Sequence, residues 1–437
     1  MSNRHYIQHL SSTSVEGSRA LVEEDIYNEF GVLLLKRGNL FGPHAASQLT
    51  DHKLTAPIDE LLRIPEIDAY DVLPGLTRML REEHDLQLIA AAHADAHSYQ
   101  ALCSTCQFST AIKQRLAVLE QKFPAVFQRA LFCAWLGSLV ASEQGLPEED
   151  LQLVFKAALV HDLGLLEIEP ALVDKKAHTT AKEWQQIQRH PQMAANLIKQ
   201  HEPENERLLQ IILDHHERCD GAGYPNKKLE ENQEPLAEII AVCDMLYALR
   251  FNNLDNGSVT LGSLIPYLSV NSRTYGLANY RTLVAIFQHS PRPANTDTDS
   301  LNAASTADLT TVLKSMDEMR GIFEELISIV GENQANSEIA SIRRIADQAH
   351  WALLSSGITS PALRSLLTIE EPDTEDPALL SNVNIVARET LWLVRKLLRQ
   401  LVELPEDAMK GIDITLLAEA RRRLEGQLKH CELLFSS

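Results

Sequence analysis

The chain has 437 residues, 45% hydrophobic and 23% charged, a composition typical of globular proteins and not of disordered or fibrous ones. At roughly 150 residues per domain, the length predicts two or three folding units. The formal net charge of −20 would repel DNA or RNA over most of the surface. We therefore expect no nucleic-acid polymer as a partner, and any phosphate-bearing ligand must be held by local positive charge such as a metal ion.

The start of the chain and its cysteines predict a cytoplasmic protein. The first residues are polar and lack the apolar stretch of a secretory signal. No apolar run approaches the roughly 20 residues of a membrane helix, so we expect no membrane insertion. The six cysteines are scattered, and the single CxxC pair, Cys103 with Cys106, has no second pair at zinc-site spacing, which favours reduced thiols.

Residues 1–70 are predicted to form a small unit that contains both helix and strand. Between residues 18 and 45, two β-prone runs flank the turn-forming segment Asn28-Glu29-Phe30-Gly31, a pattern that predicts a β-hairpin. Over residues 71–289 apolar residues recur every three and four positions, with few strand signals. The fold class is therefore predicted to be mainly α, with a helical domain following the small unit.

The last third of the chain is predicted to be a separate helical bundle. Residues 290–308 are rich in Pro, Asn, Thr, Ser and Asp without an apolar period, which indicates a linker. Residues 309–437 then show several amphipathic stretches, enough for about four helices. Such a bundle offers a surface for self-association or for a protein partner, and nothing in it looks catalytic.

Several predicted helices end an apolar stripe with residues that can bind a metal. Apolar residues at helical spacing precede His161, which places it on a buried face with Asp162 beside it. The same pattern precedes the His215-His216 pair and Asp244. Burying carboxylates and imidazoles would cost several kcal/mol unless something pairs with them, and a bound cation supplies that pairing.

The spacing along the chain joins these residues into one centre. Asp162 is followed by His190 after 28 residues, His190 by His215 after 25, and His216 by Asp244 after 28, each suited to one helix-turn-helix excursion. A lone helix histidine is usually a core or surface residue, but this joint pattern favours a metal centre. Mixed nitrogen and oxygen ligands suit iron, manganese or zinc. An aspartate beside a ligating histidine can bridge two such ions, which would clamp a phosphodiester.

Four stretches together resemble the HD-GYP subclass of the HD phosphohydrolase superfamily: His161-Asp162, EWQQIQRHP at 183–191, HHERCDGAGYP at 215–225 and EIIAVCD at 238–244. The resemblance covers roughly residues 115–260 and implies an HD-type helical bundle around a metal centre. It also implies a bacterial signal-transduction hydrolase that acts on cyclic di-GMP.

Carried onto this chain, the resemblance implies roles for individual residues. Two divalent ions would be held by six ligands: His161, Asp162, His190, His215, His216 and Asp244. Asp162 would be the bridge, and Asp162 with His161 would be catalytic. Residues of the following loop would shape the substrate site: Gly221, Gly223, Tyr224 and Pro225. Glu217 has two open readings, a partner that orients a histidine or a solvated helix residue.

The sequence departs from the family pattern at positions that bear on activity. The helix that normally supplies a further histidine offers Phe127, Gln128 and Arg129 instead, so one metal position is under-ligated. Leu165 stands where a phosphate-binding lysine is expected. Asn253 and Asn256 stand where basic residues are expected, and Arg250 is the candidate that partly compensates as a substrate-binding residue. Three upstream histidines are candidate replacement ligands, although surface roles are favoured: His84, His93 and His97.

Three functions follow from these observations. The first is a metal-dependent phosphodiesterase that opens cyclic di-GMP, with activity weakened by the lost clamps. The second is a catalytically degenerate relative that serves as a metal-containing nucleotide sensor or a scaffold for protein interaction. The third is a phosphohydrolase for a different small phosphate ester, which the missing lysine favours.

Overall fold

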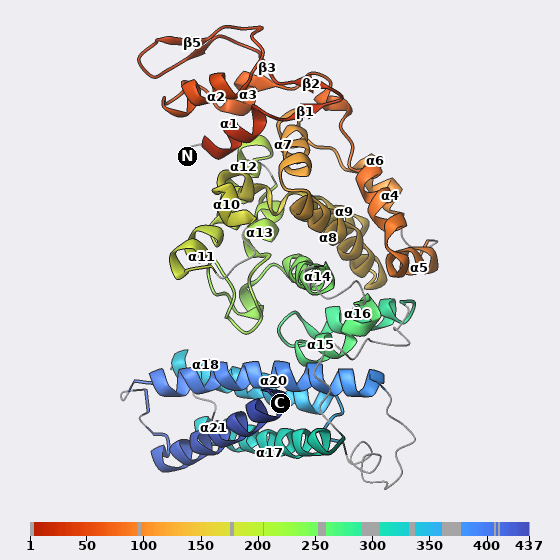
Figure 1. Cartoon of the computed structure of the whole chain (residues 1–437), viewed down its shortest axis with the longest axis vertical. Helices are drawn as coiled ribbons and strands as arrows, with labels where there is room; N and C mark the ends of the chain where they lie inside the picture. Colours follow the sequence, from red (N-terminus) through yellow and green to blue (C-terminus); the bar gives the residue numbers. More distant parts are fainter. Residues whose placement is uncertain are drawn as a thin grey trace. The chain divides into compact units, whose positions relative to one another are not determined.

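The computed structural model of the chain describes residues 4–94, 98–174, 179–203, 205–251, 259–290, 306–331, 337–360, 377–405, 408–409 and 411–436 (Figure 1). Its contacts divide the chain into two compact units. The first contains Met1–Glu217 and Gly223–Tyr247, and the second contains Arg218–Ala222 and Ala248–Ser437. Helices dominate both units, which confirms the mainly α prediction. The division falls inside a helix, and the predicted linker bounds, 290–308, stay a prediction because most of that segment lies outside the described residues.

Short strands and helices form the start of the first unit. Three antiparallel two-stranded ladders pair β1 with β2, β3 with β6 and β4 with β5. The bounds are α1 (Arg4–Leu10), β1 (Ser14–Val15), β2 (Ser18–Arg19), β3 (Leu21–Val22), β4 (Ile26–Tyr27), β5 (Leu33–Leu35), α2 (Pro43–Thr50), α3 (Ile58–Leu61), β6 (Leu62–Arg63) and η1 (Ile67–Ala69).

The β4–β5 pair is the predicted hairpin, which the structure confirms. Asn28 makes the turn, because its side-chain Oδ1 accepts from the backbone N–H groups of Phe30 at 3.0 Å and Val32 at 2.9 Å. Gly31 completes the turn with φ of +75°, a conformation that glycine adopts without steric cost.

A core of helices makes up the rest of the first unit. The longest helix described in this unit, α8, packs against α4, α7 and α9, and α12 packs against α13 and the short 3₁₀ helix η2. The bounds are α4 (Leu73–Glu82), α5 (His84–Ala92), α6 (Tyr99–Thr105), α7 (Thr110–Lys122), α8 (Pro124–Glu143), α9 (Glu148–Val160), η2 (Leu163–Glu167), α10 (Pro170–Val173), α11 (Ala181–Ile187), α12 (His190–His201), α13 (Glu206–Asp214), η3 (Glu230–Asn232) and α14 (Pro235–Phe251).

Helix α8 corrects one expectation about apolar length. Its 20 residues are long and apolar enough to cross a membrane by length and composition alone, although Gln128 and Arg129 interrupt the apolar run. Most of this stretch, 72%, is buried inside the protein. The burial is what a core helix requires, since it is covered by neighbouring helices on several sides.

A buried arginine ties the N-terminal segment to the helical core. Arg115 on α7 is 2% exposed and forms ion pairs with Asp59 at 2.8 Å and Glu167 at 2.9 Å. Its guanidinium also lies 3.7 Å from the centre of the Tyr6 ring. Glu167 is the last residue of η2, and η2 begins directly after the His161-Asp162 pair. This network therefore helps to fix the segment that carries the predicted site.

The second unit contains a four-helix bundle, as the apolar spacing after residue 309 predicts. Helix α17 packs against α18 and α21, and α20 packs against the same two helices. Val312, Phe323, Ala349 and Leu397 are among its buried core residues. The bounds in this unit are η4 (Leu261–Leu264), α15 (Ile265–Val270), α16 (Leu277–Phe287), α17 (Thr306–Val330), α18 (Ser337–Ser355), α20 (Pro377–Glu403) and α21 (Ile414–Ser436).

Candidate metal centre

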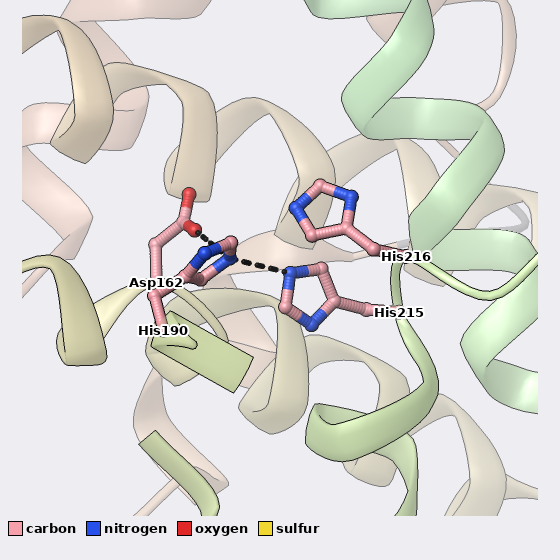
Figure 2. A group of neighbouring side chains, drawn as sticks. All are labelled: Asp162, His190, His215 and His216. Carbon is pink, nitrogen blue, oxygen red and sulfur yellow. Dashed lines mark hydrogen bonds and ion pairs between the residues drawn. The ribbon is translucent and has the colours of Figure 1, made fainter. Parts of the chain in front are cut away.

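The ends of three helices and the middle of a fourth carry the six predicted ligands of the first unit. His161 follows α9, His190 begins α12, His215 follows α13, and Asp244 lies within α14. The six side chains form two groups that share Asp162. In each group the candidate ligand atoms lie within 4.8 Å of one another: Asp162, His190, His215 and His216 in the first group (Figure 2), and His161, Asp162 and Asp244 in the second.

Backbone carbonyls fix the rings of three of these histidines. The Nδ1 atom of His161 lies 2.7 Å from the carbonyl oxygen of Ala158, and the same contact to the carbonyl three residues earlier occurs at His190 and His215. A carbonyl oxygen can only accept a hydrogen bond, so Nδ1 must carry the proton in each ring. In a neutral imidazole the Nε2 atom is then left with a free lone pair.

The Nε2 atoms of two of these rings meet each other and a carboxylate. His190 Nε2 lies 3.2 Å from His215 Nε2 and 3.2 Å from Asp162 Oδ1. Two acceptor nitrogens and a carboxylate oxygen repel one another unless a cation lies among them. The first group therefore fits a divalent ion of the iron, manganese or zinc class. In metal-binding histidines the ring nitrogen that does not bind the ion usually donates a hydrogen bond, as Nδ1 does here in His190 and His215.

Burial keeps two of the rings neutral. Burial, followed by the neighbouring His161 and His190, lowers the pKa of His215 well below its usual value. Burial, followed by His215 and His190, does the same for His216. A ring that stays unprotonated at neutral pH keeps its lone pair for a metal.

A glycine lets His190 approach Asp162. Gly164 lies in η2 directly against the start of α12, so a Cβ atom there would be 2.1 Å from the carbonyl oxygen of His190 and 2.9 Å from the amide nitrogen of Ala194. Both are backbone atoms, which cannot rotate away as a side chain does. The glycine two residues after Asp162 is therefore needed for this close contact and not for an unusual φ angle.

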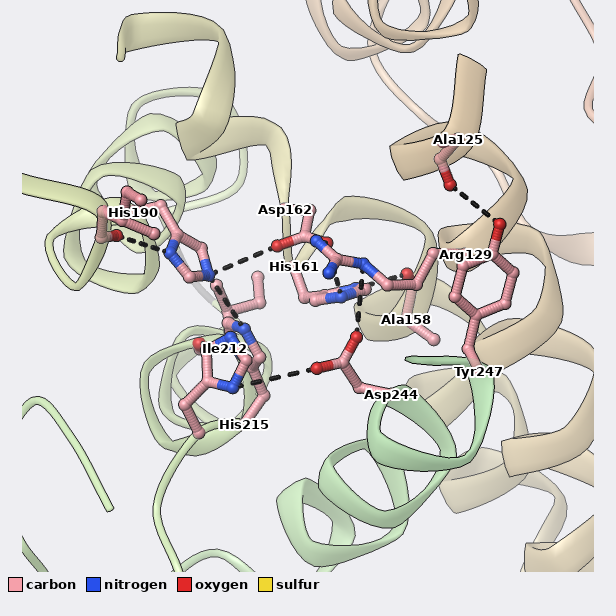
Figure 3. A network of polar contacts seen from close by, with 12 residues as sticks. Ala125, Arg129, Ala158, His161, Asp162, His190, Ile212, His215, Asp244 and Tyr247 are labelled. Atoms are coloured by element: carbon pink, nitrogen blue, oxygen red, sulfur yellow. Dashed lines mark hydrogen bonds and ion pairs between the residues drawn. The ribbon is translucent and has the colours of Figure 1, made fainter. Parts of the chain in front are cut away.

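An arginine occupies the second group (Figure 3). The guanidinium of Arg129, from α8, donates to Asp162 Oδ2, and its Nε lies 3.2 Å from Asp244 Oδ1. Burial opposes its charge, but the two carboxylates raise the pKa of Arg129 above its usual range. Arg129 belongs to the stretch that offers Phe127, Gln128 and Arg129 where a further histidine ligand was expected. Its guanidinium contacts two of the carboxylates that the second ion would need.

The carboxylate of Asp162 and the side chains around it shift one another's pKa values. Burial alone would raise the pKa of Asp162, but Arg129 and then His161 hold it well below its ordinary value. Burial likewise opposes the charged form of His161, whereas Asp162, 3.0 Å from its Nε2, raises the pKa of that ring. Asp162 is thus ionised, and His161 is able to hold a second proton on Nε2.

Glu217 holds the loop that follows the histidine pair. Its side chain is 1% exposed, and its two carboxylate oxygens accept from the backbone N–H groups of Asn226 at 2.5 Å and Lys228 at 2.9 Å. The solvated reading of Glu217 is therefore wrong, and the described contacts go to loop amides instead of to a histidine ring. The carboxylate fixes the path of the chain past Tyr224.

Tyr224 lies against the histidines of the first group. Its ring stacks on His216, with centroids 4.6 Å apart and planes at 28°. Trp184 also contacts the Tyr224 ring in an edge-to-face arrangement, with centroids 5.8 Å apart. Sequence reasoning missed Trp184, which is 43% exposed, and its only signal was its place in the stretch that ends in His190.

The remaining predicted residues lie in several places. Gly223 is buried and Pro225 is exposed, both in the first unit beside Tyr224. Gly221 and Arg250 belong to the second unit, so their roles in substrate binding stay predictions. Leu165 is buried in an apolar cluster with Ile168 and Leu172.

Of the three upstream histidines, His93 pairs with Glu143 at 2.9 Å, and His84 begins α5. Neither belongs to a metal-binding group among the described residues. His97, Asn253 and Asn256 lie outside the described residues.

Comparison with known proteins points to a single domain type. The family model for the HD domain matches residues 99–276. The chain is 32% identical to the cyclic di-GMP phosphodiesterase response regulator RpfG of Xanthomonas campestris pv. campestris over 137 residues, 30% of this chain and 35% of that protein. It is 27% identical to the cyclic di-GMP phosphodiesterase PA4108 of Pseudomonas aeruginosa over 175 residues, 40% of this chain and 42% of that protein.

A third relative is named as a phosphodiesterase for a related cyclic dinucleotide. The chain is 30% identical to the 3'3'-cGAMP-specific phosphodiesterase 2 of Vibrio cholerae over 125 residues, 28% of this chain and 22% of that protein. The matched segment therefore spans well under half the length of each of these relatives. Among solved structures, the HDG"Y"P protein Bd1817 of Bdellovibrio bacteriovorus overlaps 64% of this chain and 97% of its own at 15% identity, with a TM-score of 0.33, too low to support a conclusion.

Proposed function

We propose, from the premise that residues 99–276 belong to the HD domain family, that this centre is the active site of a metal-dependent phosphodiesterase for a cyclic dinucleotide such as cyclic di-GMP. The observation that carries the proposal is the close approach of His190 Nε2 to both His215 Nε2 and Asp162 Oδ1, at 3.2 Å each. Asp162, His190, His215 and His216 would hold a divalent ion of iron, manganese or zinc. That ion would supply the Lewis acidity that polarises a phosphodiester and acidifies water.

Residues of the chain complete the chemistry. Asp162 is ionised and accepts from Arg129, so it is fixed in place beside the reacting phosphate. His161 is able to carry a proton on Nε2 and to give it to the oxygen that leaves, the task of a general acid. Tyr224, held by its stack on His216, forms one wall of the substrate site, and burial raises the pKa of its hydroxyl so that it stays a hydrogen-bond donor.

The proposal is tested by hydrolysis and metal content together. The purified chain, loaded with Mn²⁺ or Fe²⁺, is mixed with cyclic di-GMP and, separately, with 3'3'-cGAMP, and the products are separated by chromatography. We expect linear dinucleotide or mononucleotide from the wild type and none from Asp162→Asn or His216→Ala. Glu231→Gln changes an exposed acid on the same unit and serves as the control. Unchanged turnover by Asp162→Asn would refute the assignment.

A second function is favoured by one observation, the burial of Leu165 in an apolar cluster where a phosphate-binding lysine is expected. Without that lysine, the chain would bind a cyclic dinucleotide without cleaving it and would act as a metal-containing sensor or scaffold. The signal would pass through the C-terminal helices, or through a partner or a second copy bound to them. Tight binding of cyclic di-GMP without products in the assay above would select this function. A panel of other phosphate esters tests the third function in the same assay.

A further inference from the structure

Arg129 is placed where a second metal ion would need its ligands. Among the described residues, the second group has three members, His161, Asp162 and Asp244. Arg129 donates to Asp162 Oδ2 and lies 3.2 Å from Asp244 Oδ1, so one carboxylate oxygen of each aspartate is already paired with positive charge (Figure 3). The remaining contact of this group, His161 Nε2 to Asp162 Oδ2 at 3.0 Å, uses the same oxygen as Arg129.

The two oxygens of Asp162 thus face different neighbours. Oδ1 lies 3.2 Å from His190 Nε2, on the side of the first group. Oδ2 faces Arg129 and His161, on the side of the second group. A bridging carboxylate normally gives one oxygen to each of two metal ions, and here the second oxygen goes to a guanidinium.

The charge on Arg129 is permanent. A guanidinium does not lose its proton under physiological conditions, and two carboxylates lie beside this one. A divalent ion in the second group would lie within a few ångströms of this charge and would have to compete with it for both carboxylates, and like charges at such a distance repel strongly in a buried site. The second group therefore does not fit a metal ion while Arg129 is present.

We propose that Arg129 takes the place of the second ion, so that the centre binds one divalent ion, in the group of Asp162, His190, His215 and His216. This replaces the expectation of two ions. The planar guanidinium keeps N–H donors beyond those used for Asp162 and Asp244, and it suits a phosphate oxygen. Arg129 thereby supplies the positive charge next to the single ion that a second metal supplies elsewhere. The inference rests on the proposed function only in requiring that the first group takes an ion.

The test counts ions and reads their spectrum instead of measuring turnover. The metal-free full-length chain is titrated with Mn²⁺, the bound ions are counted by elemental analysis after gel filtration, and electron paramagnetic resonance distinguishes an isolated Mn²⁺ from a coupled pair. We expect one ion and an uncoupled six-line signal in the wild type and in Arg129→Lys, which keeps the charge. Arg129→His removes the charge and adds an imidazole, and we expect two ions with a coupled signal.

Controls separate the possible failures. Arg78→His exchanges an exposed arginine on α4 and is expected to keep one ion. Two ions in the wild type, or one ion in a folded Arg129→His, would overturn the inference and leave the proposed function standing. No ion in the wild type would overturn both. If Arg129→His fails to fold, the wild-type count and spectrum decide alone, since two coupled ions contradict the inference and a single uncoupled ion supports it.

Discussion

Replacing Gly164 by alanine is expected to damage the metal centre without touching a ligand. The new Cβ would lie 2.1 Å from the carbonyl oxygen of His190, whereas ordinary contacts begin near 3.4 Å, so η2 and the start of α12 must separate by more than 1 Å. Metal–ligand distances tolerate only about 0.2 Å. His190 is therefore drawn away from Asp162 and His215, and we expect metal affinity to fall by about 100-fold, the upper end of the range for loss of ligand support.

The strain also lowers stability, by roughly 1–3 kcal/mol for an overfilled contact in a packed interior. Isothermal titration with Mn²⁺ measures the affinity, and thermal unfolding of the metal-free chain measures the stability. Gly426→Ala is the matched control: Gly426 is exposed on α21 with open space at its Cβ position, so alanine there is expected to be neutral or to stabilise by up to about 1 kcal/mol. Wild-type Mn²⁺ affinity in Gly164→Ala would refute the reasoning about the close approach.

Three further predictions concern the loop that Glu217 holds, the buried ion pair of Asp59 with Arg115, and the exposed side chain of Trp184. Glu217→Gln removes charge from two hydrogen bonds, so hydrogen exchange of the loop around Asn226 should quicken by roughly 10-fold or more, with Glu231→Gln as an unchanged control. Asp59→Asn leaves buried Arg115 with less countercharge and should lower the unfolding free energy by about 3 kcal/mol at neutral pH. Burial would raise the pKa of Asp59, but Arg115 outweighs it and lowers the pKa to about 2, below the usual 3.8. The wild type therefore loses this stability as the pH falls from about 4 towards 2. The variant should lack that part of the acid-unfolding slope. Trp184→Ala should weaken cyclic di-GMP binding by about 10-fold if a guanine stacks on the exposed ring, and Trp184→Phe should retain most of the affinity; equal affinities in all three would exclude stacking.

Local pattern was enough to predict the class of the fold and its family. Apolar residues at helical spacing predict the helices of both units, and the Asn28–Gly31 segment predicts the β4–β5 hairpin, because both depend on neighbours within a few residues. The motif residues around His161 and His215 predict an HD domain, which the family match confirms. The convergence of the ligands on one centre was also expected, since His161, the His215-His216 pair and Asp244 each follow an apolar stripe that must face the interior.

Contacts between distant segments could not be read from the sequence. From the sequence, the stretch that contains Arg129 could only be described as lacking a histidine ligand. The packing of α8 on α9 shows that the guanidinium of Arg129 lies between Asp162 and Asp244 instead. Glu217 gives no local sign of its partners, because its two amides lie 9 and 11 residues further along. The two units likewise divide within α14, a helix without a break in its pattern.

The hydrogen bonds from ring nitrogens to carbonyls three residues earlier tie ligand direction to helix register. His161 and His215 each cap the end of a helix, so the ring is aimed by the backbone before any ion arrives, and the partial negative charge at each helix end attracts a cation. A helix turns by about 100° per residue, so deleting one residue from α13 would aim His215 away from the centre even with every ligand retained. The lengths of α9 and α13 are therefore as important to the site as the identity of its ligands.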